Sequence, residues 1–395
     1  MAGPDFPRAE FESRLATIQT RMHGANLDAL FFTSEAEMRY FTGFRTLFWQ
    51  SPTRPWFLVV PRSGMPVAVI PEIGAELMRS AFVGEVRSWA SPHPDDDGLS
   101  LLADALRPHA RIGMMMGRET GLRMPLADFE TLRTGLCGCE FTDATAIVQR
   151  QRMVKSEAEI ALIGEICSIA SKSFEAAPQL FREGQTLSDA FRAFKIELLK
   201  NGAEDVPYLV GGAGQGGYGD VISPPGENWL EAGDVLMLDT GATLRGYYCD
   251  FDRNFAIGHA SADARLAHDT LWRATEAALA VARPGATCRD LFEAMAASPH
   301  SAAAAVSPAA HSPARRALTS SLVTGSIARG AALSVRNVGA TGSTLSSDEY
   351  LSGHPAPSFD NRDVGRNDER RDSELLYKTP AHIVSHVTNG QLLAD

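Results

Sequence analysis

The chain has 395 residues, of which 44% are apolar and 22% charged, and its formal net charge is −11. This length favours two domains, and the composition is that of a globular protein with enough apolar residues for a sizeable core. The acidic balance disfavours nucleic acid as a partner, and the lack of a long apolar run or a secretory signal predicts a cytoplasmic protein without a membrane segment.

Residues 1–150 are predicted to form an N-terminal α/β domain. Phe11, Leu15, Ile18 and Met22 recur at spacings of three and four, which predicts one apolar face of a helix. Short apolar runs bounded by Gly and Pro are typical of buried strands. Such runs lie at 27–32, 56–61 and 67–71, and helices are predicted at 74–81, 99–107 and 125–134.

Residues 151–296 are predicted to form a second domain. Ser156 and Glu159 have the spacing of a capping box, which predicts the start of a long amphipathic helix. Further helices are predicted at 191–199 and 271–281, with a strand-rich stretch at 206–258 between them.

The composition changes from about residue 297. Residues 297–372 contain no Lys, Met, Trp or Cys, and only one Phe and one Tyr. A segment so poor in large apolar residues buries little surface, so 297–395 is predicted to be an aberrant, poorly packed or disordered segment. A shift of reading frame near residue 297 would explain the change, and translating the other two frames of the gene would test it.

The residues that point to chemistry lie in the stretch 233–258. Two strand-like runs flank a turn near Leu244 to Gly246, which predicts a hairpin with Asp239 and Asp250 opposite each other. Side chains alternate along a strand, so Asp252 shares a face with Asp250. Three like charges on one face require a cation, a proton or a charged substrate between them, unless some of the acids face solvent or pair with neighbouring arginines.

This hairpin resembles the Asp-x-Gly and Gly-Tyr-x-x-Asp-x-x-Arg pattern of the creatinase/prolidase (M24) family. The resemblance covers residues 10–296, and Arg152-Met-Val-Lys-Ser-x-x-Glu-Ile is typical of the junction between that family's two domains. It implies an α/β (α+β) protein with a creatinase-like N-terminal domain and a pita-bread catalytic domain, incomplete after residue 296. In the metallopeptidase branches the positions of Asp239 and Asp250 hold divalent metals, whereas creatinase uses the fold without metal.

The sequence also departs from the peptidase pattern. Proline-specific members carry a His in a Pro-His-Tyr-like motif before the hairpin, but the corresponding stretch here is 216–225, and no His occurs between residues 110 and 258. The later His-Gly-x-Gly motif and two Glu motifs of the family are not recognisable. The Gly-x-Gly-x-x-Gly at 212–217 is not followed by a helical pattern, so a dinucleotide site is rejected in favour of a pocket loop.

The stretch 32–57, together with 205–214 and 248–255, resembles the ectoine hydrolases. That resemblance implies hydrolysis of the cyclic amidine of ectoine, or of hydroxyectoine, to N-acetyl-L-2,4-diaminobutyrate by a homodimer in which the loop matching residues 45–54 comes from the partner subunit. Asp239, Asp250 and Asp252 would complement the amidinium, and Arg54 would bind the carboxylate. Phe48, Trp49 and Tyr208 are the aromatic candidates for substrate contact.

Each candidate has a structural alternative: Phe48 and Trp49 as core or dimer-interface residues, Arg54 in a structural ion pair, and Tyr208 as a packing residue. Two alternatives to the ectoine reaction also remain open. One is a metal-dependent Xaa-Pro dipeptidase or aminopeptidase, and the other is an inactive binding protein of the same family.

Overall fold

The computed structural model describes residues 5–51, 54–220 and 222–297. Contacts within it divide the chain into two compact units, Met1–Met153 and Val154–Asp395. The predicted aberrant segment 297–395 lies outside the described residues, except for Ala297 at its start. Among the described helices none is both long and apolar enough to cross a bilayer.

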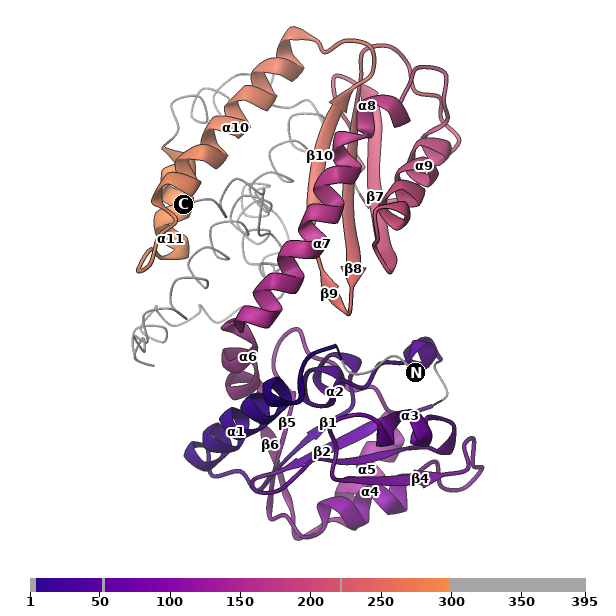
Figure 1. The fold of residues 1–395 in the computed structure, drawn as a ribbon, viewed down its shortest axis with the longest axis vertical. Helices are drawn as coiled ribbons and strands as arrows, with labels where there is room; N and C mark the ends of the chain where they lie inside the picture. The colour runs from indigo at the N-terminus through magenta and orange to yellow at the C-terminus, as the bar shows by residue number, and fades with distance from the viewer. Residues whose placement is uncertain (1–4, 52–53, 221, 298–395) are drawn as a thin grey trace, which may run out of the picture. The chain divides into compact units, whose positions relative to one another are not determined.

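The first unit is built on a six-stranded mixed sheet in the order β4-β3-β2-β1-β5-β6 (Figure 1). Strands β1 and β3 pair antiparallel with β2, while β3–β4, β1–β5 and β5–β6 are parallel pairs. The strands are β1 (Ala29–Phe32), β2 (Phe57–Pro61), β3 (Val67–Pro71), β4 (Glu85–Trp89), β5 (Arg111–Met114) and β6 (Glu140–Asp143). The helices are α1 (Arg8–Gly24), α2 (Glu35–Thr42), the 3₁₀ turns η1 (Leu47–Gln50) and η2 (Glu72–Gly74), α3 (Ala75–Arg79), α4 (Leu99–Leu106), α5 (Leu126–Gly135) and α6 (Thr145–Met153).

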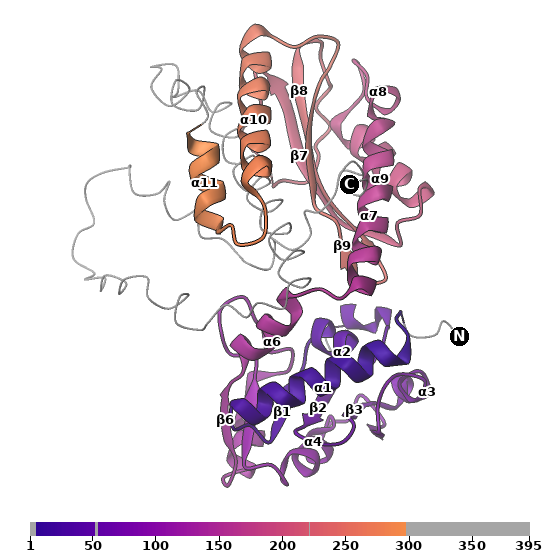
Figure 2. The same cartoon turned by 60° about the vertical axis from the view of Figure 1, so that its left-hand side comes forward.

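Helices cover both faces of this sheet, as Figure 2 shows for α1 and α4. On one face Phe31 and Phe57 pack with Leu102 and Leu132, which come from α4 and α5. On the other face Phe32 stacks on Phe41 of α2, with ring centroids 5.3 Å apart. Burial on both faces explains why the strand sequences are continuous apolar runs rather than alternating ones.

The second unit contains an antiparallel sheet in the order β10-β8-β7, and the short strand β9 also pairs with β8. Its strands are β7 (Asp205–Gln215), β8 (Asp234–Leu244), β9 (Tyr247–Tyr248) and β10 (Phe251–Ala256). Its helices are α7 (Glu157–Glu175), α8 (Ala177–Leu180), α9 (Leu187–Lys200), α10 (Ala262–Val281) and α11 (Cys288–Ala296). Helix α10 begins nine residues before the predicted start at 271, because Ser261 accepts a hydrogen bond from Ala264 N and caps it.

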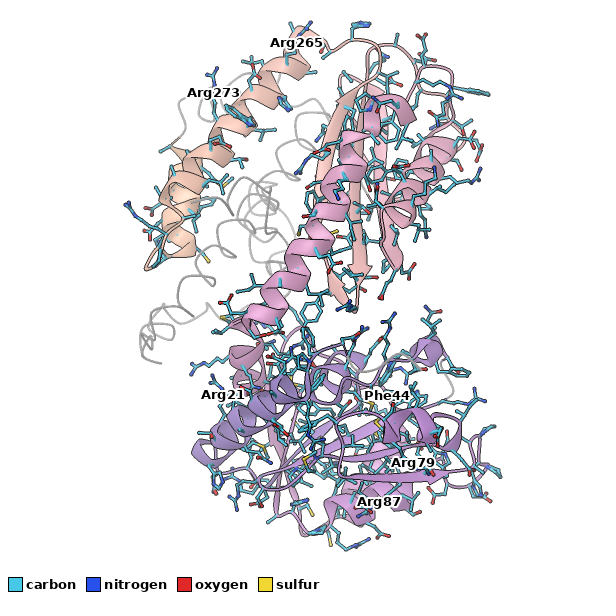
Figure 3. All side chains as sticks on the ribbon, in the orientation of Figure 1. Arg21, Phe44, Arg79, Arg87, Arg265 and Arg273 are labelled. Atoms are coloured by element: carbon cyan, nitrogen blue, oxygen red, sulfur yellow. The ribbon has the colours of Figure 1, made fainter. Side chains whose placement is uncertain are left out.

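Aromatic packing covers one face of this second sheet. Phe174 of α7 stacks on Phe251 and Phe255 of β10 at 6.0 and 6.1 Å, and it contacts Phe194 of α9 at 4.5 Å. Side chains alternate along β10, so Arg253 shares the face of these phenylalanines and lies over the Phe174 and Phe251 rings, while Asp252 and Asn254 point to the opposite face of the sheet. Figure 3 shows α10 with Arg265 and Arg273 extending away from the ribbon, consistent with a helix that buries only a narrow strip.

The predicted capping box at the start of α7 is present, and it also holds the hairpin. Ser156 accepts from Glu159 N, while Glu159 Oε2 accepts from Ser156 N at 2.9 Å. The other carboxylate oxygen, Glu159 Oε1, accepts from the Tyr247 hydroxyl at 2.6 Å. One buried carboxylate therefore joins the N-terminus of α7 to the hairpin.

We expect Glu159→Ala to lower the free energy of unfolding by about 1–3 kcal/mol, because it removes two hydrogen bonds to a buried charged group. Glu157→Ala is the matched control, since Glu157 is an exposed acid in the same first turn. Urea unfolding followed by circular dichroism measures both. Equal losses in the two variants would mean that only the helix dipole is involved.

Candidate active site

The acidic residues lie on a tight hairpin formed by β8, β9 and β10. Arg245 and Gly246 both have positive φ, 48° and 76°, and the flanking residues Leu244 and Tyr247 are paired. Two consecutive residues in the left-handed region form the type I′ turn, whose twist matches that of antiparallel strands. The turn lies where the sequence predicts it.

The register differs from the prediction in one respect. Asp252, and not Asp250, lies directly opposite Asp239. With a two-residue turn at 245–246, the pairing Thr243 with Tyr248 continues to Asp239 with Asp252, which leaves Asp250 two residues nearer the turn. The predicted direct opposition of Asp239 and Asp250 was therefore wrong, because it assumed a turn centre one residue earlier.

The three acids nevertheless share one face of the sheet with Tyr208. Val210 pairs with Asp239, and Tyr208 pairs with Gly241, so the alternation of β7 brings the phenol to the same face. The Tyr208 hydroxyl donates to Asp250 Oδ1 at 2.9 Å. The acidic face, defined here as Tyr208, Asp239, Asp250 and Asp252, thus combines three carboxylates with one hydroxyl donor.

Close packing explains the Gly of the Asp-x-Gly pattern. A Cβ atom on Gly241 would lie 2.1 Å from Tyr208 Cε1 and 2.6 Å from Cζ. Only glycine leaves room for the Tyr208 ring at this point of β8, and from that position the hydroxyl reaches Asp250. The glycine therefore supports the acidic face indirectly.

The negative charges of the three carboxylates on this face repel one another unless a positive charge or a proton lies between them. Burial, together with the charges of Asp250 and Asp252, raises the pKa of Asp239 to about 8. Asp239 Oδ1 is buried and has no hydrogen-bond partner within the described part of the chain. A carboxylate in this state favours a proton, a cation or a cationic group of a substrate.

Two tyrosines border the acids. Burial and then the charge of Asp250 raise the pKa of Tyr208, and burial followed by the charge of Asp252 raises that of Tyr218, so both phenols stay protonated. The Tyr218 hydroxyl donates to Asn254 Oδ1 at 2.8 Å. Sequence analysis missed this pair, although alternation along β10 already places Asn254 on the face of Asp252.

Asp239 and Asp250 provide oxygen ligands of the kind that hard divalent cations prefer, and the bare Oδ1 of Asp239 fits such a role. A bound metal would supply Lewis acidity and activate water for hydrolysis. Within residues 5–51, 54–220 and 222–297, however, no group of three or more His, Cys, Asp or Glu side chains could hold a metal ion. A metal bound by Asp239 and Asp250 would therefore need ligands beyond the described residues.

The remaining candidates lie together in the first unit. The Arg54 guanidinium lies 5.7 Å from the centre of the Phe48 ring. Trp49 is only 8% exposed, and its ring contacts Trp56 at 5.8 Å and Arg123 at 5.1 Å. The faces of the Trp49 ring are thus used in packing. In the second unit, the Tyr208 hydroxyl is used in the hydrogen bond to Asp250. Phe48 is the most exposed of the three predicted aromatic candidates.

Comparison with known proteins gives the family. Residues 14–154 match the creatinase/prolidase N-terminal domain, and residues 161–315 match metallopeptidase family M24. The chain belongs to the creatinase/prolidase-like M24 family. The predicted fold class is confirmed: the mixed α/β structure combines the creatinase-type N-terminal domain with the pita-bread architecture of M24 proteins.

Similar proteins of this M24 family include dipeptidases. The chain is 26% identical over 294 residues to a protein named probable dipeptidase PepE from Mycobacterium tuberculosis strain H37Rv, covering 74% of this chain and 76% of that one. The crystal structure of dipeptidase PepE from Mycobacterium ulcerans is 27% identical, with a TM-score of 0.63 and coverage of 76% and 79%. The prolidase from Pyrococcus horikoshii OT3, at 20% identity and a TM-score of 0.62 over 72% and 76% of the chains, shares the fold.

Proposed function

We propose that this chain is an M24 hydrolase that cleaves the C–N bond of a dipeptide with a divalent metal held in part by Asp239 and Asp250. The observation that carries the proposal is the acidic face, where burial and two neighbouring carboxylates raise the pKa of Asp239 to about 8. Such a carboxylate cluster is stabilised by a cation. The match to metallopeptidase family M24 and the similarity to the PepE dipeptidases support a peptidase over other hydrolases.

Ectoine ring opening is the second candidate, and a specific observation favours it. The chain has no His between residues 110 and 258, and a buried Tyr218 hydrogen-bonded to Asn254 occupies the stretch where proline-specific relatives carry their His. Three carboxylates can complement the delocalised amidinium of ectoine or hydroxyectoine without metal. Arg54 is proposed to bind the substrate carboxylate in either reaction, since a dipeptide and ectoine both carry one.

The decisive assay uses the purified full chain, stripped with EDTA and then assayed with and without Mn²⁺. We expect hydrolysis of Gly-Pro or of a non-proline dipeptide such as Ala-Ala to appear with Mn²⁺ and to disappear with EDTA. Asp250→Asn should lower this rate at least about 100-fold, while Asp263→Asn, an exposed acid on α10, should not.

Other outcomes of this assay identify the alternatives. Ring opening of ectoine that EDTA does not affect would replace the dipeptidase proposal with the ectoine reaction. Binding without turnover of any of these compounds would indicate an inactive binding protein. Sedimentation of the same preparation tests the accompanying proposals of a homodimer, and fractionation of the producing cells tests a cytoplasmic location.

A further inference from the structure

Two of the five cysteines lie one residue apart, in the turn that joins α5 to β6. Cys137 is exposed, Cys139 is half-buried, and both are free thiols. The other three cysteines are far from this pair in the sequence: Cys167 and Cys249 are buried, and Cys288 is exposed in the second unit. The first unit therefore carries two neighbouring thiols, of which at least one is open to solvent.

A β-turn sets the spacing of the two thiols. Cys139 N donates to the carbonyl oxygen of Leu136 at 2.8 Å, which closes a four-residue turn with Cys137 and Gly138 at its centre. Gly138 is not among the glycines with positive φ in the described ranges, so the turn is of type I. Residues two apart in this near-helical conformation have Cα atoms roughly 5.4 Å apart. That spacing lies within the range of about 4.4–6.8 Å that a disulfide spans.

Gly138 gives the turn the freedom that closure of a disulfide requires. The two side chains lie in different surroundings, one in solvent and one half-buried, so the backbone between them must rotate before their sulfurs can meet. Glycine has the widest range of backbone conformations. A Cβ atom added at Gly138 would meet no atom within 4 Å, so the centre of the turn also has open space in which to move.

The different surroundings give the two thiols different roles. Cys139 packs against the apolar core of the first unit that contains Leu132 and Leu136, whereas Cys137 is exposed. Attack on a small disulfide requires a thiolate that the disulfide can reach. Cys137 is therefore the thiol that reacts first, and Cys139 is the thiol that can displace the product of that reaction.

We propose that Cys137 and Cys139 are a redox-active dithiol, which a low-molecular-weight disulfide such as oxidised glutathione converts into an intramolecular disulfide. The Cys137 thiolate attacks one sulfur of oxidised glutathione, forms a mixed disulfide and releases one glutathione thiolate. The Cys139 thiolate then attacks the Cys137 sulfur, closes the ring and displaces the second glutathione thiolate. Two electrons pass from the protein dithiol to the small disulfide, and the two thiol protons pass through the solvent to the two glutathione thiolates.

This modification is reversible. A disulfide across a single residue closes a small, strained ring, and strained, exposed disulfides are easily reduced. Excess reduced glutathione returns the pair to the dithiol by the same two steps in reverse. Reversible disulfides of this kind serve as redox sensors. The proposal is independent of the proposed hydrolysis, because it involves neither the acidic face nor a metal.

Mass spectrometry of peptides from the folded full chain, treated with oxidised glutathione and then alkylated, tests the proposal. We expect the peptide with Cys137 and Cys139 to lose two hydrogens, and reduced glutathione to restore them. Cys288 is the matched control: it is exposed but has no neighbouring thiol, so it should gain one glutathione. A stable glutathione on Cys137 beside a free Cys139 would refute the proposal, and so would an unreacted pair in a chain whose Cys288 has reacted.

Single substitutions test the order of the two steps. Cys139→Ser should hold the mixed disulfide on Cys137, because no thiol remains to displace it. In Cys137→Ser, Cys139 should react about tenfold more slowly than Cys137 does in Cys139→Ser, because it is less accessible. Equal rates in these two variants would refute the assignment of Cys137 as the attacking thiol. Circular dichroism confirms that both variants are folded, and Cys288 provides the internal reference for the rate.

Gly138→Ala tests the need for rotation. Alanine fits the open space at this position but restricts the backbone, so ring closure should slow several-fold while the first attack by Cys137 keeps its rate. The mixed disulfide should therefore accumulate in this variant before the ring closes. Closure at the wild-type rate would refute the role of Gly138.

Discussion

Asp239→Asn is expected to make the protein more stable at pH 9 while it lowers the rate of hydrolysis at least about 100-fold. The pKa of Asp239 in the folded protein is about 8, against 3.8 as its ordinary value. Between about pH 4 and pH 8 the folded state holds a proton that the unfolded chain releases, so wild-type stability falls as the pH rises through this window. Asparagine is neutral at every pH and removes this dependence.

The size of the effect follows from the linkage between protonation and folding. Each pKa unit corresponds to about 1.4 kcal/mol, so the variant should exceed the wild type by on the order of a few kcal/mol at pH 9 and should match it at pH 4. Thermal unfolding in EDTA across pH 4–9 measures the difference. Equal pH profiles for the two proteins would show that Asp239 is not protonated in the folded state.

The same variant tests the metal proposal. Mn²⁺ should raise the unfolding temperature of the wild type at pH 8, because a ligand that binds only the folded state stabilises it by mass action. The unfolding temperature of Asp239→Asn should rise less on addition of Mn²⁺, and the hydrolytic rate of this variant should be at least about 100-fold lower than that of the wild type. Greater stability with lower activity is the pattern of a functional carboxylate held in an unfavourable environment.

Gly241→Ala is expected to destabilise the protein by about 1–3 kcal/mol, because the added Cβ would overlap the Tyr208 ring and must displace it from β8. Displacement also breaks the hydrogen bond from Tyr208 to Asp250, so hydrolysis should fall as well. Urea unfolding measures the first effect, and the dipeptidase assay measures the second.

The control for this change is Gly164→Ala. Gly164 lies inside α7, and a Cβ added there would meet no atom within 4 Å, so alanine should stabilise the helix by about 0.5–1 kcal/mol. Combining Gly241→Ala with Tyr208→Ala removes the overlapping ring, and the double variant should lose less stability than the two single losses added. Simple additivity would show that the ring and the glycine do not interact.

Local sequence patterns predicted much of the secondary structure. The predicted helices at 74–81, 99–107 and 125–134 correspond to α3, α4 and α5, and the apolar runs correspond to β1, β2 and β3. The capping box and the hairpin turn also lie where they were predicted, because caps and two-residue turns depend on a few neighbouring residues. The glycine-rich stretch 212–217 continues strand β7 and then turns without entering a helix, as the sequence predicted.

The acidic hairpin was visible in the sequence by itself, since alternation places Asp250 and Asp252 on one face and a turn brings β8 beside them. The tertiary structure alone decided the register that sets Asp252 against Asp239, and the burial that raises the pKa of Asp239 to about 8. It alone brought Tyr208 onto Gly241 and Arg123 onto the carbonyls of Trp49, Ser51 and Arg54. Burial and long-range hydrogen bonds depend on which strands and loops pack together across tens of residues, and no local period or spacing in the sequence records that choice.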